Sequence, residues 1–248
     1  MLETVALIYA MHAEAAPLLA RLGASPLPSE AGLPLQRSRA VLNGRLEVIL
    51  CENGVDPRFG RDYIGTEAAT LNARETLRVF SPSLVLSVGT AGGLAAKGAT
   101  LADVYLCDRF FYHDHRIPLP GWEEMGRGGL LAGNARQLAE KLGLKTGAVS
   151  SGNSLDFTAD DLERIEHCGA SVKEMEATAA AWVCSLSNTP FLALKSVTNL
   201  VHPAKRSEKE FEKNFDRAVT SLTQATHRFL EYLATAGIAE ALSMLEPK

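Results

Sequence analysis

Short apolar, β-branched runs alternate along the chain with segments of helical periodicity. Several of these runs are apolar throughout, as expected when helices cover both faces of a sheet. Six runs predict strands at residues 5–11, 46–51, 84–90, 104–112, 146–151 and 191–200. Strands and helices in alternation favour an α/β fold with a largely central sheet.

Helical periodicity and capping residues predict six helices. Three of them are expected at residues 13–22, at about 60–80 and within 174–186, and Pro17 falls in the first turn of the first helix or just beyond it. Two more are expected to begin at a capping residue: one at Asn134, and one at Thr158 with Asp161 at the third position. The sixth begins at Ser207 with Glu210 three residues later, which predicts a capping box. One stripe of this last helix is apolar: Phe211, Phe215, Leu222, Phe229 and Leu233.

The stretch from about residue 113 to 133 has no clear period and is predicted to be a loop. It contains "HDHRIPLPGWEEMGRGG", and loops of this length in compact domains usually carry function or an interface. Its side chains include Arg116, Trp122, Met125 and Arg127, which are residue types enriched at protein interfaces. This loop therefore favours a homodimer.

The composition fits a single domain over residues 1–248. No internal repeat or long polar linker divides the chain, and 46% apolar residues can build one large core. A net charge of −4 and a pI near 5.9 argue against a nucleic-acid partner, which normally meets a basic face. No run approaches the roughly 18 apolar residues of a membrane span. "MLETVALIYAM" has no basic leader region, so it is predicted to be a first strand and not a signal peptide.

The four cysteines lie far apart and form no C-x-x-C pair: Cys51, Cys107, Cys168 and Cys184. This spacing favours a reduced, cytoplasmic chain with mostly buried thiols.

Small and acidic residues follow the ends of predicted strands. "VGTAGG" (88–93) follows a buried strand, and small residues there let a backbone approach a ligand closely. Ligands of open α/β sheets bind at the carboxyl ends of strands, although a tight turn explains this motif equally well. Glu14 follows the first strand, where a carboxylate also suits the start of a helix.

"KEMEATA" places Glu174 and Glu176 just before an almost uniformly apolar helix. A lone charge in such a setting is costly without a partner. A paired hydroxyl, such as the 2′/3′ diol of a ribose, would satisfy Glu176.

Two other chemistries have weaker support. His113 and His115 in "HDH" would lie on one side of an extended segment, but the sequence offers no evident third and fourth zinc ligand. A Ser/His/Asp hydrolase would need a G-x-S-x-G elbow, which the chain lacks.

Taken together, "ALIYAMHAEA", "SVGTAGGL", "SSGNSLDF", "EMEATAAAWV" and "KSVTNLV" resemble the 5′-methylthioadenosine/S-adenosylhomocysteine nucleosidase family of the nucleoside phosphorylase superfamily. "FYHDHRIPLP" and "NGVDPRFGRDYIGT" are similar to its plant-type branch. The resemblance covers nearly the whole chain. It implies a single α/β domain around a mixed, partly barrel-like sheet, a homodimer, no cofactor, and a purine nucleoside as the small-molecule partner.

The resemblance also implies a water-activating site. Glu14 matches the general base that activates the attacking water, and Thr90 lies where a small hydroxyl residue helps to hold that water. Ala91 and Gly92, from the same "GTAGG" motif, are expected to line the substrate. Lys195 occupies the position of a basic residue near the water and Glu14.

For the substrate itself, the resemblance assigns Met175 and Glu176 to the ribose. The carboxylate accepts from the sugar hydroxyls, and the thioether packs on the sugar. Leu155 stands where an aromatic residue stacks on the base, and Asp156 stands where the backbone reads the purine edge. An aliphatic residue at position 155 weakens stacking.

Asn199 departs from the family pattern, which has an aspartic acid 23 residues after the ribose carboxylate. That acid protonates purine N7, and such acid catalysis contributes about 10²–10⁴-fold. An amide can donate a hydrogen bond to N7 but cannot deliver a proton. Three explanations stay open: a natural member tuned to a 6-oxopurine, an Asp→Asn variant made to trap substrate, or a silent binding or storage relative.

Hydrolysis is favoured over phosphorolysis. Phosphorolytic relatives surround phosphate with arginines, whereas Glu14 would repel phosphate and suits a water nucleophile. Arg58 and Arg61 in "DPRFGRD" are more consistent with solvated loop charges. The resemblance also implies that a partner subunit lines part of the 5′ pocket, for which "FYHDHRIPLP" is the candidate segment.

Overall fold

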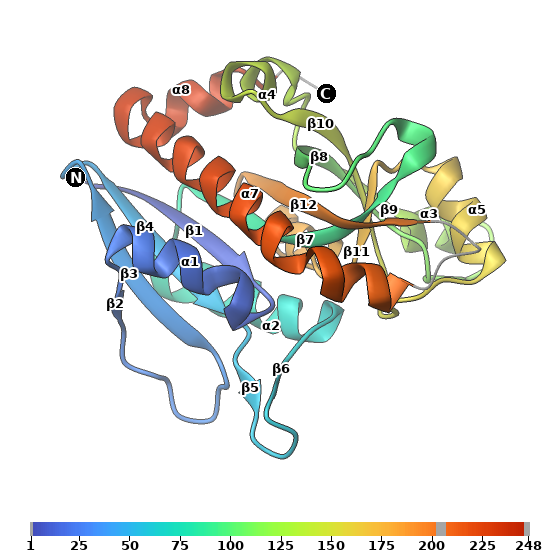
Figure 1. Ribbon diagram of the computed structural model, residues 1–248, viewed down its shortest axis with the longest axis horizontal. Helices are drawn as coiled ribbons and strands as arrows, with labels where there is room; N and C mark the ends of the chain where they lie inside the picture. The colour runs from blue at the N-terminus through green and yellow to red at the C-terminus, as the bar shows by residue number, and fades with distance from the viewer. Residues whose placement is uncertain (1, 202–206, 246–248) are drawn as a thin grey trace.

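The computed structural model describes residues 2–201 and 207–245, and Figure 1 labels its elements. All six predicted strands are confirmed as β1 (Glu3–Tyr9), β4 (Leu46–Glu52), β7 (Leu84–Leu94), β8 (Val104–Tyr112), β10 (Lys145–Ser151) and β12 (Phe191–Val201). Six shorter or more polar strands were not predicted from the sequence: β2 (Ser25–Pro26), β3 (Gln36–Leu42), β5 (Val55–Asp56), β6 (Arg61–Asp62), β9 (Gly128–Leu131) and β11 (Val172–Glu174).

Ten of these strands form one mixed sheet. Its path runs β11-β10-β8-β12-β7-β1-β4-β3-β2, with β9 paired to β8. Because β11 also pairs with β7, the strands β7, β12, β8, β10 and β11 close into a ring. The neighbours β4, β1, β7 and β12 run parallel, whereas β8 runs antiparallel to β12. This sheet confirms the predicted mixed, partly barrel-like α/β fold.

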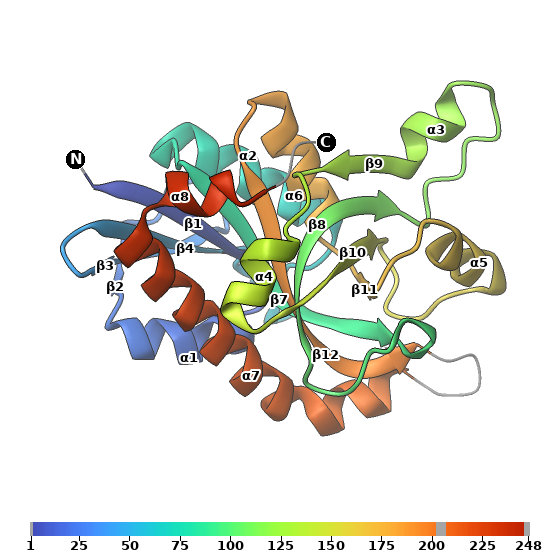
Figure 2. The same ribbon diagram turned by 90° about the horizontal axis from the view of Figure 1, so that it is seen from above.

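Helices cover both faces of the sheet (Figures 1 and 2). One face packs against α1 (His12–Leu22), α4 (Arg136–Leu142), α7 (Ser207–Ala236) and α8 (Ile238–Ser243). The other face packs against α2 (Thr66–Phe80) and α6 (Ala177–Leu186). Three short elements lie at the periphery: the 3-10 turn Ala95–Lys97, α3 (Trp122–Arg127) and α5 (Ala159–His167).

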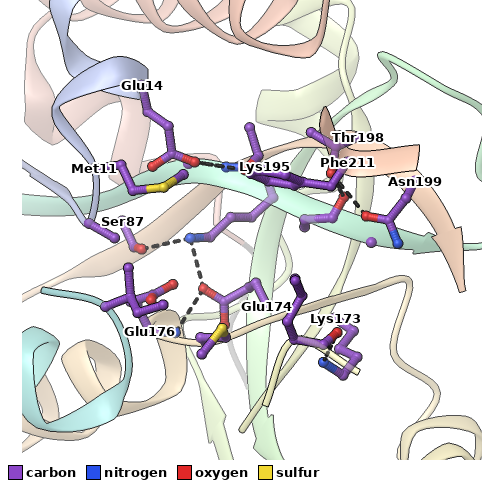
Figure 3. Close-up of a pocket in the computed structure, with 18 of the residues that line it drawn as sticks. Met11, Glu14, Ser87, Lys173, Glu174, Glu176, Lys195, Thr198, Asn199 and Phe211 are labelled. Atoms are coloured by element: carbon purple, nitrogen blue, oxygen red, sulfur yellow. Dashed lines mark hydrogen bonds and ion pairs between the residues drawn. The ribbon is translucent and has the colours of Figure 1, made fainter. Parts of the chain in front are cut away.

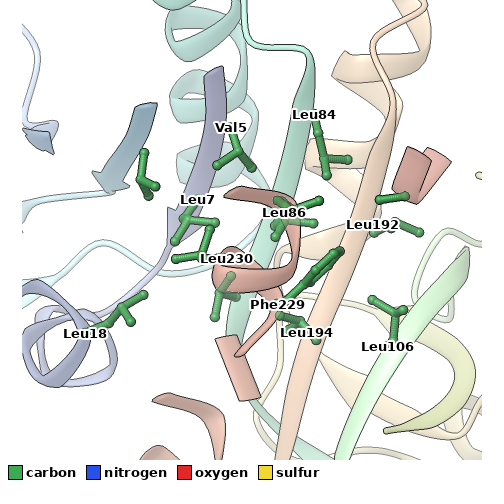
Figure 4. Close-up of a cluster of buried hydrophobic side chains, with 14 of the residues drawn as sticks. Val5, Leu7, Leu18, Leu84, Leu86, Leu106, Leu192, Leu194, Phe229 and Leu230 are labelled. Carbon is green, nitrogen blue, oxygen red and sulfur yellow. The ribbon is translucent and has the colours of Figure 1, made fainter. Parts of the chain in front are cut away.

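This double covering explains why the strands are apolar throughout. In β1, Leu7 packs with Leu18 and Phe229 beneath α1 and α7 (Figure 4), whereas Ala6 and Ile8 face the cluster that includes α2 and α6. Successive side chains of a strand point to opposite faces, so both sets must be apolar when neither face meets water.

The apolar stripe predicted on the last helix packs against the core along most of its length, and its first residue, Phe211, lies near the carboxyl ends of the strands. Leu222, Phe229 and Leu233 are buried in the core, as predicted. Near the helix start, the rings of Phe211 and Phe215 lie 5.2 Å apart between their centroids. The predicted capping box of Ser207 with Glu210 involves a side chain outside the described part of the chain.

Two predicted boundaries were wrong. The second helix begins at Thr66 and not near residue 60, because residues 61–62 pair as β6 and Gly65 at the N-cap has a φ of 95°. The predicted loop 113–133 contains α3 and β9, and β9 pairs with β8. The glycines at 126, 128 and 129 interrupt the hydrophobic pattern, so neither element could be recognised by its period.

Helix caps were predicted with mixed success. The capping box of Thr158 with Asp161 is confirmed at the start of α5. The Asn134 side chain accepts from the backbone N–H of Arg136 at 3.1 Å, although Ala135 holds the N-cap position of α4. Pro17 lies inside α1, beyond its first turn. Across the described residues, no helix combines the length and apolar character needed to span a membrane.

Candidate active site

A partly open cavity of about 200 Å³ lies at the carboxyl ends of β1, β7 and β12. Parallel strands place their carboxyl ends at one edge of a sheet, which is where ligands of open α/β sheets bind. The start of α1, the segment after β10, the end of β11 and the first turns of α7 complete its wall. Figure 3 shows Glu14 and Glu176 on the left of this pocket and Asn199 and Lys173 on the right.

Glu14 is buried at the first turn of α1, with 3% of its surface exposed. The backbone N–H and the hydroxyl of Thr90 both donate to its Oε1, each at 2.7 Å. Burial raises the pKa of Glu14, while the Thr90 hydrogen bonds and the charge of Lys195 oppose the rise. A carboxylate with a raised pKa is suited to accepting a proton near neutral pH.

Lys195 is fully enclosed between β12 and its neighbours. Its Nζ lies 2.8 Å from Glu174 Oε2 and donates to Ser87 Oγ at 3.0 Å. Burial acts to lower the pKa of Lys195, but the charges of Glu174 and Glu176 outweigh burial and raise it. The charge of Lys195 also acts on Glu14, so this ammonium balances the acidic side chains around the cavity.

Glu174 anchors Lys195 and the start of α6 together. Its carboxylate accepts from Lys195, from Ser151 Oγ, and from the backbone N–H groups of Glu176 and Ala177. Burial acts to raise the pKa of Glu174, but Lys195 and the hydrogen bonds hold it below its usual value. Glu174 therefore stays charged and fixes the geometry of the segment that follows it.

Glu176 is the N-cap residue of α6 and projects into the cavity. Its Oε1 accepts from the backbone N–H of Gly65 at 2.8 Å. Burial, followed by the charge of Glu174, raises the pKa of Glu176 to about 7. The preceding Met175 also lines the cavity. One carboxylate oxygen is thus held by the backbone, and the remaining acceptor capacity is available to ligand hydroxyls.

Asn199 is brought into the cavity by a β-bulge in β12. The register against β7 shifts between Val197, which pairs with Ala91, and Asn199, which pairs with Gly92. Residues two apart in a regular strand share a face, and a bulge re-aims the side chain that follows it. Val197 consequently packs beside Gly93, whereas Asn199 lies beside Gly92.

The amide of Asn199 is 5% exposed. Its Oδ1 accepts from the hydroxyl of Thr198 at 3.0 Å. A Cβ added at Gly92 would lie 3.1 Å from Asn199 Nδ2. The absence of a side chain at Gly92 therefore leaves the space beside the Asn199 amide open.

Apolar side chains complete the cavity. Leu155 and Phe157 contribute from the segment between β10 and α5, and Met11, Ile64 and Phe211 contribute from three other segments. Such a surface suits a flat base and an apolar substituent.

The structure brings nine of the ten residues predicted for the site to one cavity: Glu14, Thr90, Ala91, Gly92, Leu155, Met175, Glu176, Lys195 and Asn199. Asp156 is exposed and is not part of the cavity wall. Lys173, Phe157 and Phe211 are among the wall residues that were not predicted from the sequence. Phe211 heads the apolar stripe of α7, and that position was the available signal.

The residues behind the weaker alternatives lie elsewhere. His113 is buried with its Nδ1 3.1 Å from Ser150 Oγ, and the ring of His115 stacks on Tyr112. Within residues 2–201 and 207–245, no three His, Cys, Asp or Glu side chains gather as metal ligands. Arg58 pairs with Asp56 in the β5–β6 hairpin, outside the described cavity wall.

The chain matches the model of the phosphorylase superfamily over residues 4–231. It is 32% identical to a 5′-methylthioadenosine nucleosidase of Arabidopsis thaliana, with 94% of this chain and 88% of that protein covered. A 5′-methylthioadenosine/S-adenosylhomocysteine nucleosidase of the same plant is 30% identical, with 94% and 92% covered. The apo structure of Arabidopsis thaliana 5′-methylthioadenosine nucleosidase superposes with a TM-score of 0.92 at 31% identity, over 96% of this chain and 99% of that one. This chain therefore belongs to the 5′-methylthioadenosine/S-adenosylhomocysteine nucleosidase family of the phosphorylase superfamily.

Proposed function

We propose that this chain hydrolyses the N-glycosidic bond of a 5′-thio-substituted purine nucleoside, releasing the base and the 5-thio-substituted ribose. The observation that carries the proposal is that one cavity holds a buried carboxylate with a raised pKa, Glu14, together with Glu176 and Asn199. The names of the Arabidopsis relatives support 5′-methylthioadenosine as the substrate, and S-adenosylhomocysteine as a second one.

Glu14 acts as the general base in this proposal. The two Thr90 hydrogen bonds fix one carboxylate oxygen, which leaves the other to accept a proton from water. As the water oxygen bonds to C1′ of the ribose, its proton passes to Glu14 and the bond from C1′ to the base breaks. The negative charge of Glu14 repels phosphate, which favours water as the nucleophile.

Glu176 binds the sugar. Its carboxylate, already held by Gly65, accepts from the ribose hydroxyls, and Met175 packs on the sugar. Hydrogen bonds to a charged group are roughly twice as strong as neutral ones. Ribose binding therefore depends on the ionised form of Glu176.

The base lies against Leu155 and the aromatic residues Phe157 and Phe211, beside Asn199. The Asn199 amide donates to N7 but has no proton to transfer. The departing base therefore carries negative charge and takes its proton from solvent. Binding is retained in this arrangement, whereas turnover of an adenine nucleoside is slow.

A second candidate substrate is a 6-oxopurine nucleoside, and Asn199 is the observation that favours it. An amide accepts from N7–H through its oxygen and donates to O6 through its nitrogen. Its Nδ2 and Oδ1 both lie near the open space at Gly92. Oδ1 already accepts from the Thr198 hydroxyl and has a second lone pair for N7–H.

We also propose a cytoplasmic homodimer. All four cysteines are free, which suits a reducing compartment. The segment predicted as an interface exposes large apolar side chains on and before α3, with Leu119 57%, Trp122 55% and Met125 63% exposed. Exposed apolar side chains that gather in one segment are typical of an interaction surface.

Chromatography of the products of 5′-methylthioadenosine and of its 6-oxo analogue, with and without added phosphate, tests the proposed function. We expect release of the free base and 5-methylthioribose at a rate that does not depend on phosphate, and its loss in Glu14→Gln. Phosphate dependence would overturn hydrolysis. Tight nucleoside binding with no turnover of either substrate would instead identify a silent binding relative.

A further inference from the structure

The segment 154–157 forms the apolar wall of the cavity but has little structure of its own. It connects β10 to α5 in neither helix nor strand. Leu155 and Phe157 from this segment line the cavity, and Leu155 is 48% exposed. A wall built on an irregular, exposed segment needs an anchor to hold a fixed shape.

Lys173 on β11 supplies that anchor. Its Nζ donates to the backbone oxygen of Ser154 at 2.5 Å and to that of Leu155 at 3.2 Å. In the part of the chain that the structure describes, these are the hydrogen bonds that residues 154–157 make. Two of the wall's carbonyl groups, those of Ser154 and Leu155, are thus held by one side chain from β11.

The ammonium group of Lys173 is buried, whereas most lysine side chains are exposed to solvent. Lys173 is 5% exposed and itself lines the cavity. Burial lowers its pKa, against the opposing charges of Glu174, Asp156, Asp161 and Asp114. An ammonium is costly to bury without partners, and the partners that Lys173 reaches are the two wall carbonyls.

The sheet register places Lys173 opposite Asn199. Both residues pair with Gly92 of β7, Lys173 from β11 on one side and Asn199 from β12 on the other. Paired residues of neighbouring strands project to the same face, so the open space over Gly92 lies between the two side chains. Figure 3 shows both on the same side of the pocket.

We propose that Lys173 is a positioning residue that fixes the Ser154–Phe157 wall and thereby determines the affinity of the site for the purine base. The inference rests on the proposed function. The clamp fixes the backbone at Ser154 and Leu155, two residues before the Phe157 ring that also lines the cavity. Glu176, which lies on the other side of the pocket in Figure 3, holds the sugar. Lys173 therefore affects binding of the base and not binding of the sugar.

Calorimetric titration of free adenine and of free 5-methylthioribose separates these effects. In Lys173→Met, which keeps the length of the stem without the donor, we expect adenine affinity to fall at least tenfold and 5-methylthioribose affinity to change less than twofold. Lys173→Gln, which is neutral and retains a donor, should give an intermediate loss of adenine affinity. Lys97→Met, at an exposed lysine, is the matched control and should change neither affinity.

An equal loss of affinity for both ligands would show a general structural role of Lys173 and overturn the proposal. Unchanged adenine affinity in folded Lys173→Met would overturn it as well. If Lys173→Met does not fold, the result with Lys173→Gln decides. Failure of the wild-type protein to bind any purine would refute the proposed function instead, so the two failures are distinguishable.

Discussion

Restoring an acid at position 199 tests the chemistry of this site most directly. Asn199 is 5% exposed, and its Oδ1 is already occupied by the Thr198 hydroxyl at 3.0 Å. In Asn199→Asp, the other carboxyl oxygen would take the place of Nδ2, beside the open space at Gly92. Burial favours the protonated carboxylic acid, so this oxygen would present a transferable proton to the base.

The size of the effect follows from the role of one general acid. Positioned proton transfer contributes about 10²–10⁴-fold, which corresponds to about 3–5 kcal/mol of the barrier at 1.36 kcal/mol per factor of ten. Affinity should change little, because Glu176, Met175 and the apolar wall do not depend on a transferable proton. The expected result is therefore a rise in kcat for adenine release of two or more orders of magnitude.

The assay is single-turnover release of adenine from 5′-methylthioadenosine, with nucleoside affinity measured separately by titration calorimetry. Asn188→Asp, the same change at an exposed turn, is the control and should leave the rate unaltered. A flat rate in Asn199→Asp protein that still binds nucleoside would refute the placement of Asn199 at the leaving base. If the wild type prefers the 6-oxopurine analogue and Asn199→Asp reverses this preference, Asn199 instead tunes the site to a 6-oxopurine base.

Three further predictions follow from the buried charges and the exposed surface. Because the pKa of Glu176 is raised to about 7, its carboxylate is lost as pH falls through that value, and nucleoside affinity should weaken about tenfold per pH unit below it. Glu176→Gln should lower nucleoside affinity at pH 8 and abolish this dependence, and a flat wild-type profile from pH 8 to 5.5 would contradict the ribose assignment. Glu174→Gln leaves Lys195 buried beside a neutral partner, so chemical denaturation should show a loss of about 3–5 kcal/mol in the free energy of unfolding. A loss below about 1 kcal/mol would show that the Lys195–Glu174 ion pair is not needed for stability. Light scattering at micromolar concentration should give twice the chain mass, and a monomer mass would exclude the homodimer; Trp122→Glu should shift the dimer toward monomer.

The hydrophobic pattern by itself determined six largely apolar strands, most of the helices and the α/β class of the fold. This succeeded because strands covered on both faces are apolar throughout, as in β1, and because the α7 stripe has a strict helical period. The resemblance of the sequence motifs to the nucleosidase family likewise predicted nine residues of the cavity wall. The carboxyl ends of parallel strands meet at one edge, so motifs that end strands converge in space whatever their separation in sequence.

Tertiary structure alone decided how those side chains face one another. The bulge that turns Asn199 toward Gly92 depends on pairing with β7, which no local pattern of β12 encodes. The strand β11 is three residues long, contains two charged residues, and exists because β7 and β10 pair with it. Lys173 and Lys195 are both buried lysines, yet their partners differ. Lys173 donates to backbone carbonyl groups, whereas Lys195 pairs with the Glu174 carboxylate. Their roles follow from partners that are distant in sequence, because a buried charge is defined by what surrounds it after folding.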